Sequence, residues 1–161
     1  MRILVAVTLA AALSGCASYA GRGLVPGQAT MQDVERVMGP AADQRPAAGD
    51  TVRYYSRQPY GREVYAARFG PDGKLKSIEQ RLTEQNYAKL VPGTTRASDA
   101  RDLLGPPYRI DQFPRMQREV WTYYVNGMTN DQQLFVQLSR DGIVREVFVI
   151  DDPNAVPRNH E

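Results

Sequence analysis

Apolar and polar positions follow the same order in two stretches of the chain. LVPGQATMQDVERVMGP at 24–40 aligns without a gap on LVPGTTRASDARDLLGP at 90–106. The matched apolar positions are Val34, Val37 and Met38 in the first stretch and Ala100, Leu103 and Leu104 in the second. Such spacings place side chains on one face of a helix, and the Gly-Pro that closes each stretch ends a helix. The pattern therefore predicts one short helix in each copy of a tandem repeat.

Polar residues ahead of the apolar positions indicate how the two helices begin. In the first helix, Thr30 and Asp33 take the N-cap and N3 positions of a pair that resembles a capping box. In the second helix, Thr95 or Ser98 can act as the cap. Because propensity alone does not hold helices of about nine residues, both are expected to pack against a sheet.

Downstream of each helix the period changes from helical to alternating, which predicts strands. Residues 51–55 and 120–125 are rich in aromatic and β-branched side chains and form the first predicted strand of each repeat. The later strands are predicted at 63–69 and 74–82 in the first repeat and at 132–138 and 143–150 in the second. Asp72-Gly73 and Asp141-Gly142 predict tight hairpin turns between the later strands.

The alignment of the strands assigns the faces of the predicted sheets. Tyr54-Tyr55 is aligned on Tyr123-Tyr124 by inserting three residues in the loop after the second helix. Because side chains alternate along a strand, the face under the helices is expected to carry Tyr54, Tyr65, Ala67, Phe69, Trp121, Tyr123, Leu134, Val136 and Leu138. The opposite face is expected to carry Arg53, Tyr55, Val64, Ala66 and Arg68 in the first repeat and Tyr124, Phe135, Phe148 and Ile150 in the second.

An antiparallel sheet normally keeps one face wet, so the apolar face that carries Phe135 and Phe148 is expected to be covered. The simplest cover is the first repeat, or the far side of a continuous sheet.

The predicted fold class is α+β, with two tandem repeats. Each repeat is a short helical segment followed by a three-stranded antiparallel meander, and the helices pack on one face of the sheet. The predicted organisation is a lipoprotein signal peptide at 1–15, a lipidated tether at 16–23, a first repeat at 24–87, a second repeat at 88–152 and a flexible tail at 153–161. Whether the repeats share one six-stranded sheet or form two domains is open, although the short connector at 83–87 favours tight packing.

The first residues resemble the signal sequence of bacterial lipoproteins. Arg2 precedes an apolar run that is too short to span a bilayer, and Leu13-Ser14-Gly15-Cys16 is similar to a lipobox. The resemblance implies cleavage before Cys16 and attachment of diacylglyceryl and amide-linked chains such as palmitate. Two or three such chains hold a protein on a membrane. Ala17 stands where an aspartate would signal retention at the inner membrane, so the expected location is the periplasmic face of the outer membrane. An ordinary secretory signal with a nearby cysteine is the alternative.

Charge and residue types exclude several functions. Removal of the signal peptide leaves 19 basic and 18 acidic side chains out of the 20 and 18 of the whole chain, which gives no basic footprint for nucleic-acid binding. The chain has one cysteine, Cys16, and one histidine, His160 in the C-terminal tail. Cys-His, Ser-His-Asp and His-rich metal sites are therefore not expected. Asp102, Asp111 and Glu119 are the remaining carboxylate candidates for acid–base chemistry, but such groups are more often solvated charges. We expect no enzyme activity, cofactor, metal or small-molecule substrate.

The motifs of both repeats resemble the BamE family, also called SmpA/OmlA. GTTRASDARDLLGPPY at 93–108, VWTYYV at 120–125 and LFVQLSRDGIVREV at 134–147 carry the pattern in the second repeat, and GQATMQDVERVMGPA at 27–41 carries it in the first. The resemblance implies a small outer-membrane lipoprotein that can assist the machine which folds and inserts β-barrel proteins. The two-repeat arrangement is also similar to the β-lactamase inhibitor proteins, in which helix pairs pack on one side of a curved sheet.

Two function classes follow. The first is a protein-binding accessory or scaffold in outer-membrane protein assembly or envelope integrity, with envelope proteins as partners. The second is an inhibitor or binding module for a periplasmic enzyme. Candidate partner-binding residues lie in the loops at 57–63 and 126–133 and on the apolar sheet face, and have types enriched at interfaces. They are Arg57, Tyr60, Arg62, Met128, Tyr124, Phe135 and Phe148.

Overall fold

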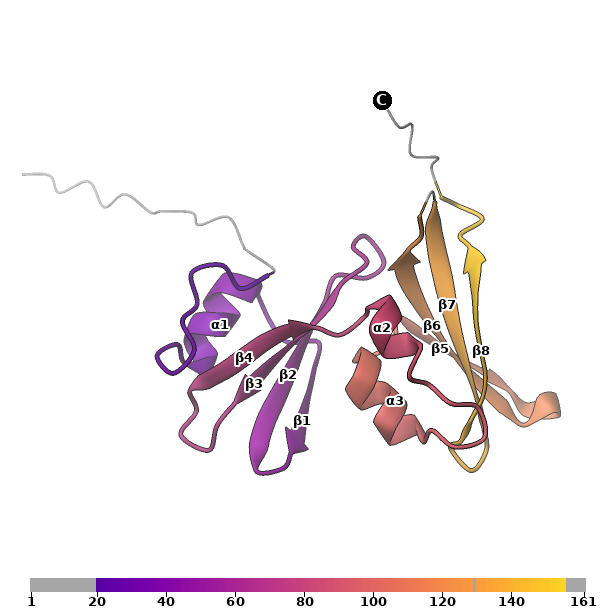
Figure 1. Cartoon of the computed structure of the whole chain (residues 1–161), viewed down its shortest axis with the longest axis horizontal. Helices are drawn as coiled ribbons and strands as arrows, with labels where there is room; N and C mark the ends of the chain where they lie inside the picture. Colours follow the sequence, from indigo (N-terminus) through magenta and orange to yellow (C-terminus); the bar gives the residue numbers. More distant parts are fainter. Residues whose placement is uncertain (1–19, 129, 156–161) are drawn as a thin grey trace, which may run out of the picture.

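The computed structural model of the chain describes residues 20–128 and 130–155. It contains two four-stranded antiparallel sheets, each with its strands in sequence order (Figure 1). The first sheet consists of β1 (Asp43–Ala47), β2 (Asp50–Ser56), β3 (Val64–Phe69) and β4 (Leu75–Gln80). The second consists of β5 (Arg109–Phe113), β6 (Arg118–Asn126), β7 (Asp131–Ser139) and β8 (Val144–Asp151). The helices are α1 (Met31–Met38), α2 (Glu84–Tyr87) and α3 (Ala97–Leu104), with a 3-10 turn, η1 (Pro114–Met116), between β5 and β6.

The α+β class is confirmed, but the three-stranded meander is wrong because each sheet has a fourth strand. The missed strands, β1 and β5, are edge strands that pair only with β2 and β6. Neither buries a full apolar face, and β1 contains Pro46, which a sheet tolerates at its edge. The alternation that reveals a half-buried strand is therefore weak in both segments.

The two longer helices lie where the apolar pattern predicts them, and α3 begins and ends 66 positions after α1. Thr30 caps α1 in a complete capping box with Asp33. The cap of α3 is Arg96, not Thr95 or Ser98. Arg96 stands at the position that corresponds to Thr30, and only its backbone N–H takes part, donating to Asp99 Oδ2 at 3.3 Å. The prediction of Thr95 or Ser98 is therefore wrong, and the cap is the residue 66 positions after Thr30.

The strand alignment that assigned the sheet faces was displaced by one residue in the first repeat. Two residues, Ala48 and Gly49, join β1 to β2, whereas Pro114–Gln117 join β5 to β6. The extra residues thus lie in the β5–β6 hairpin, and the pairings put Tyr55, not Tyr54, at the position of Tyr123. A slip of one residue moves a side chain to the other face. Tyr55 accordingly packs towards α1 with Ala67 and Phe69, and Tyr54 lies on the opposite face.

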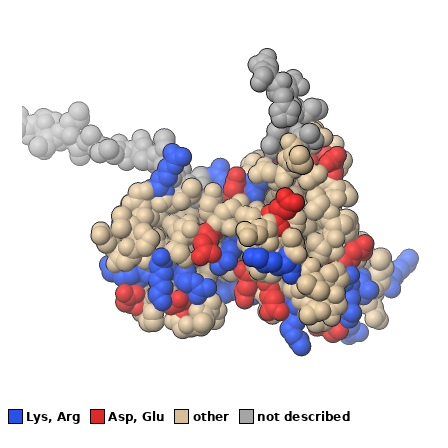
Figure 2. Space-filling view, viewed as in Figure 1, with Lys and Arg blue, Asp and Glu red and all other residues tan. Residues whose placement is uncertain are grey.

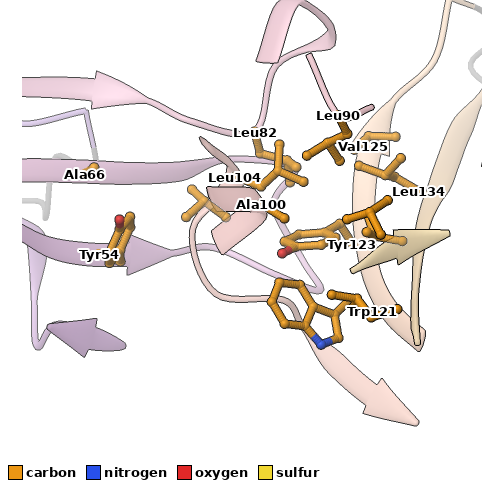
Figure 3. Close-up of a cluster of buried hydrophobic side chains, with 14 of the residues drawn as sticks. Tyr54, Ala66, Leu82, Leu90, Ala100, Leu104, Trp121, Tyr123, Val125 and Leu134 are labelled. Carbon is orange, nitrogen blue, oxygen red and sulfur yellow. The ribbon is translucent and has the colours of Figure 1, made fainter. Parts of the chain in front are cut away.

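Helix α3 lies between the two sheets (Figure 1). One core joins α1 to the first sheet and contains Val34, Met38, Tyr55, Ala67, Phe69 and Leu75. The other core contains Val52, Tyr54, Val64 and Ala66 of the first sheet, Ala100 and Leu104 of α3, and Trp121, Tyr123, Leu134 and Val136 of the second sheet (Figure 3). The layers therefore run α1, first sheet, α3, second sheet. Helices cover both faces of the first sheet but only one face of the second.

Polar contacts also join the repeats. Arg101 Nη2 of α3 lies 2.8 Å from Asp43 Oδ2 of β1, and Arg62 Nη2 lies 2.7 Å from Asp131 Oδ2 of β7. Partial burial acts to raise the pKa of Asp43, but the hydrogen bond and charge of Arg101 outweigh it and hold that pKa below its usual value. The carboxylate of Asp43 is therefore charged and paired at neutral pH.

Candidate binding surface

The face of the second sheet that points away from α3 is the candidate site, and it is called the outer face below. Strand pairing places Phe135 beside Phe148 on this face, and their rings stack with centroids 5.1 Å apart and planes 17° apart. The rings of Tyr108 and Tyr124 pack edge to face, with their centroids 5.3 Å apart. The first repeat reaches this face at Tyr124, where the Arg62 guanidinium lies 5.0 Å from the ring centre. No helix or strand among the described residues packs over Phe135 and Phe148, since the first sheet lies on the α3 side. The expectation that the first repeat or a continuous sheet covers this face is therefore wrong for Phe135 and Phe148, and it holds at Tyr124 alone.

The outer face is hollowed next to the β5–β6 hairpin. A shallow groove of about 310 Å³ is lined by side chains of all four strands, among them Arg109, Phe113, Arg118, Phe135 and Phe148. Met116 of η1 also contributes to the lining and is 63% exposed, and Phe113 is 44% exposed. Aromatic and sulfur-containing side chains that remain exposed around a hollow are typical of binding surfaces.

The structure brings three of the predicted binding residues to the outer face. These are Tyr124, Phe135 and Phe148. Tyr60 and Met128 lie instead in the β2–β3 and β6–β7 loops, each 97% exposed. Arg57 is in the β2–β3 loop, where its backbone carbonyl accepts from Gly61 N at 2.8 Å. The seven residues thus divide between a sheet face and two loop tips.

Arg62 has an internal role instead of an exposed one. Its guanidinium pairs with Asp131, donates to the carbonyl of Pro59 and lies 5.0 Å from the centre of the Tyr124 ring. Gln58 of the same loop donates to the backbone carbonyl of Tyr124 at 3.4 Å and accepts from its N–H at 3.2 Å. The β2–β3 loop therefore rests against the end of the second sheet and fixes the Tyr124 ring.

The carboxylates considered for acid–base chemistry do not form one cluster. Asp111 pairs with Arg109 at 2.7 Å, Glu119 accepts from the Trp121 indole and from the amide of Gln112, and Asp102 is exposed on α3. The described part of the chain holds no group of three or more His, Cys, Asp or Glu side chains that could bind a metal. No helix within residues 20–128 and 130–155 is long and apolar enough to cross a membrane. Cys16 and His160 lie outside the described residues.

Sequence reasoning missed Tyr108, Phe113 and Met116, because it placed no strand of the second repeat before residue 120. Tyr108-Arg109-Ile110-Asp111 alternates large apolar and polar side chains, which is the available signal, but Gln112 breaks the alternation before Phe113. Its apolar residues are half exposed, so the pattern does not stand out as a buried strand.

Together these features define an α+β protein of two stacked sheet units with one aromatic sheet face open. No protein-family model matches the chain, and no curated protein matches it. The crystal structure of a DUF4309 family protein (YjgB) from Bacillus subtilis subsp. subtilis str. 168 is similar at 20% identity, over 81% of this chain and 84% of that chain, with a TM-score of 0.31. A likeness at that TM-score carries no inference about function.

Proposed function

We propose that the chain is a non-enzymatic, lipid-anchored protein of the outer membrane that binds another envelope protein through the outer face of its second repeat. The open aromatic face carries this proposal. Phe135 and Phe148 stack at its centre, Tyr124 and Tyr108 extend the aromatic area, and Ile150 is exposed beside them. Partly exposed aromatic rings on a sheet face are costly to leave in water, and a protein partner would remove them from solvent.

The expected anchor is consistent with such a role. Attachment at Cys16 would hold the protein on the periplasmic face of the outer membrane, where clients and subunits of envelope assembly are found. The resemblance of both repeats to the BamE family supports an accessory part in outer-membrane protein assembly or envelope integrity, with the β-barrel assembly machine as one candidate partner.

An inhibitor or binding module for a periplasmic enzyme is the second candidate. The observation that favours it is the position of the two exposed loop tips, Tyr60 and Met128. They come from different repeats, and the Arg62–Asp131 pair joins their loops. The inhibitor architecture also predicts a concave surface with aromatic residues from both repeats. Tyr54 and Tyr55 of the first sheet are buried under α3 and α1, however, so the open aromatic face comes from the second repeat alone. This difference favours the accessory role.

A photo-crosslinking residue at position 150 tests the proposal in the cell envelope. Ile150 is exposed beside the aromatic stack, so the probe leaves Phe135 and Phe148 in place. We expect an adduct with one envelope protein that is lost in a Phe135→Gln/Phe148→Gln background and absent with the probe at exposed Gln32 of α1. The same adducts from both probe positions would refute binding at the outer face.

A Cys16→Ala version exported to the periplasm distinguishes the two candidates. The accessory role predicts a membrane-protein adduct that is weakened when the anchor is removed. A soluble periplasmic enzyme that is captured equally well with and without the anchor would favour the inhibitor instead.

A further inference from the structure

Four arginines in the described residues make neither an ion pair nor a side-chain hydrogen bond: Arg96, Arg115, Arg118 and Arg140. All four lie at one end of the second repeat. Arg115 and Arg118 belong to the β5–β6 hairpin, and Arg140 is in the β7–β8 turn. Arg118 pairs in the sheet with Ser139, next to Arg140, and Arg96 forms an isolated bridge with Ile143 in the same turn. Figure 2 shows basic side chains at this end of the molecule.

The acidic side chains of the same end are largely committed to other partners. Asp111 pairs with Arg109 at 2.7 Å, and Asp141 pairs with Arg145 at 3.2 Å. Glu119 accepts from Trp121 and Gln112. Glu146 of β8 is the carboxylate there without a hydrogen bond or ion pair among the described residues. The donors to Glu119 are neutral, as are the Arg96 N–H and the Ser98 hydroxyl that donate to Asp99, so these two carboxylates keep their charge. Four unpaired guanidinium groups therefore lie near three carboxylates without an ion pair, and this end presents a small positive excess that a partner can neutralise.

Apolar side chains lie beside these arginines. A hollow of about 420 Å³ between the β5–β6 hairpin and the β7–β8 turn is lined by Phe113, Leu138, Arg118 and Arg140. The groove on the outer face shares Phe113 and Arg118 with this hollow. An extended segment places successive side chains on opposite sides, so its apolar residues can enter the two hollows while its carboxylates meet the arginines.

We propose that this end of the second repeat, the β5–β6 hairpin with the β7–β8 turn, binds an extended segment of a partner protein in which acidic and apolar residues alternate. The inference rests on the proposed function, because it names the chemistry of the partner at the edge of the outer face. The first repeat offers no such site, since Ala48 and Gly49 alone join its corresponding strands. The residues added to the hairpin of the second repeat, Arg115 among them, therefore contribute to the recognition.

Two observations favour a protein segment over an anionic membrane as the occupant. The described chain begins at Ala20 and leads into α1, whereas the β5–β6 hairpin projects on the side of the molecule far from α1 (Figure 1). An anchor close to Ala20 would point the hairpin away from its own membrane. The arginines also border a hollow whose lining combines apolar side chains such as Phe113 and Leu138 with polar ones such as Gln112 and Ser139, and a hollow suits an inserted side chain better than a flat layer of headgroups.

Binding of fluorescent peptides to the purified chain tests the proposal. The probe is an octapeptide of alternating glutamate and leucine, and the reference is the same peptide with lysine for glutamate. We expect the acidic peptide alone to raise the anisotropy, and its affinity to fall by about tenfold or more when salt is raised from about 50 to about 500 mM.

Two variants locate the site. In Arg115→Gln/Arg118→Gln/Arg140→Gln the charge is removed, and in the second variant Pro114–Gln117 is replaced by Ala-Gly as in the first repeat. Both variants are expected to bind the acidic peptide with an affinity lower by about tenfold or more. Arg36→Gln/Lys76→Gln/Lys89→Gln is the control, because it removes three charges outside the second sheet and is expected to retain binding. Thermal unfolding checks that each variant is folded.

Equal binding of the lysine peptide, or equal binding by the arginine variant, would overturn the inference. So would sedimentation with phosphatidylglycerol vesicles that depends on the same arginines while the acidic peptide fails to bind, since the occupant would then be a membrane. The crosslink from position 150 separates this inference from the proposed function: an adduct that persists in the arginine variant would leave an outer-face partner whose recognition does not need this charge.

Discussion

Gly105 shows how one residue can join the two repeats. Its φ of 78° and ψ of −169° lie in a region that is almost restricted to glycine. An added Cβ would stand 2.5 Å from Val64 Cγ1 and 3.0 Å from Tyr54 Cδ1 of the first sheet. Gly39 ends α1 with closely similar angles, 84° and −171°, but a Cβ there would have no atom within 4 Å. Comparison of the two glycines therefore separates backbone strain from the close approach of the repeats.

We expect Gly39→Ala to lower the free energy of unfolding by about 1–3 kcal/mol, since the alanine must adopt an unfavourable backbone conformation. Gly105→Ala should lower the free energy of unfolding by the same amount and by a further 1–3 kcal/mol or so, because the methyl group displaces Val64 or Tyr54 in a packed core. Urea denaturation of both variants measures the difference. Equal losses would mean that the first sheet yields to the methyl group without cost.

At the scale of elements, helix α1 owes part of its stability to an ionised cap. Asp33 accepts from Thr30 Oγ1 at 2.7 Å and from Thr30 N at 2.9 Å. These hydrogen bonds, helped by Arg36, lower the pKa of Asp33 from 3.8 to about 2. Because the folded state has the lower pKa, this group contributes its full stabilisation above pH 3.8 and loses it as the pH falls towards 2.

The Asp33→Asn variant should therefore lose stability at neutral pH and show a shallower fall of stability between about pH 4 and pH 2 than the native chain. Thermal unfolding across that range measures both effects. A parallel pH dependence in the two proteins would assign the acid sensitivity to other carboxylates.

The elements that the sequence predicted are those whose burial repeats at a regular period. Both longer helices bury one stripe, and β7 alternates between buried and partly buried positions, so their patterns were readable. Strands β1 and β5 were missed because neither contains a buried residue, whereas the predicted edge strands β4 and β8 each begin with one. The aromatic face was predicted from the alternation of Phe135 with its neighbours. The pairing of Arg62 with Asp131, 69 positions later, and the hollow beside Phe113 follow from how the repeats and hairpins meet, which no local pattern contains.

In the whole molecule, α3 belongs to both sheets. Leu104 is fully buried in a core that includes Tyr54 and Val64 from the first sheet and Tyr123 and Leu134 from the second. The Tyr123 hydroxyl donates to the carbonyl of Gly105 at 3.0 Å, and burial raises the pKa of this phenol so that it stays a neutral donor. The first sheet therefore has one of its faces desolvated only while the second repeat is folded.

This arrangement predicts that the two repeats unfold as one cooperative unit. Leu104→Ala should lower the free energy of unfolding by about 2–5 kcal/mol through the cavity it leaves. The midpoint of urea unfolding should fall by the same amount whether it is followed in the first sheet or in the second. Trp121, the single tryptophan, reports on the second sheet by fluorescence, and hydrogen exchange of the β3 amides reports on the first. The β3 amides could instead keep the unfolding midpoint of the native chain while the tryptophan signal shifted to a lower one. In that case α3 would stabilise the second repeat alone, and the contact between the sheets would not couple their unfolding.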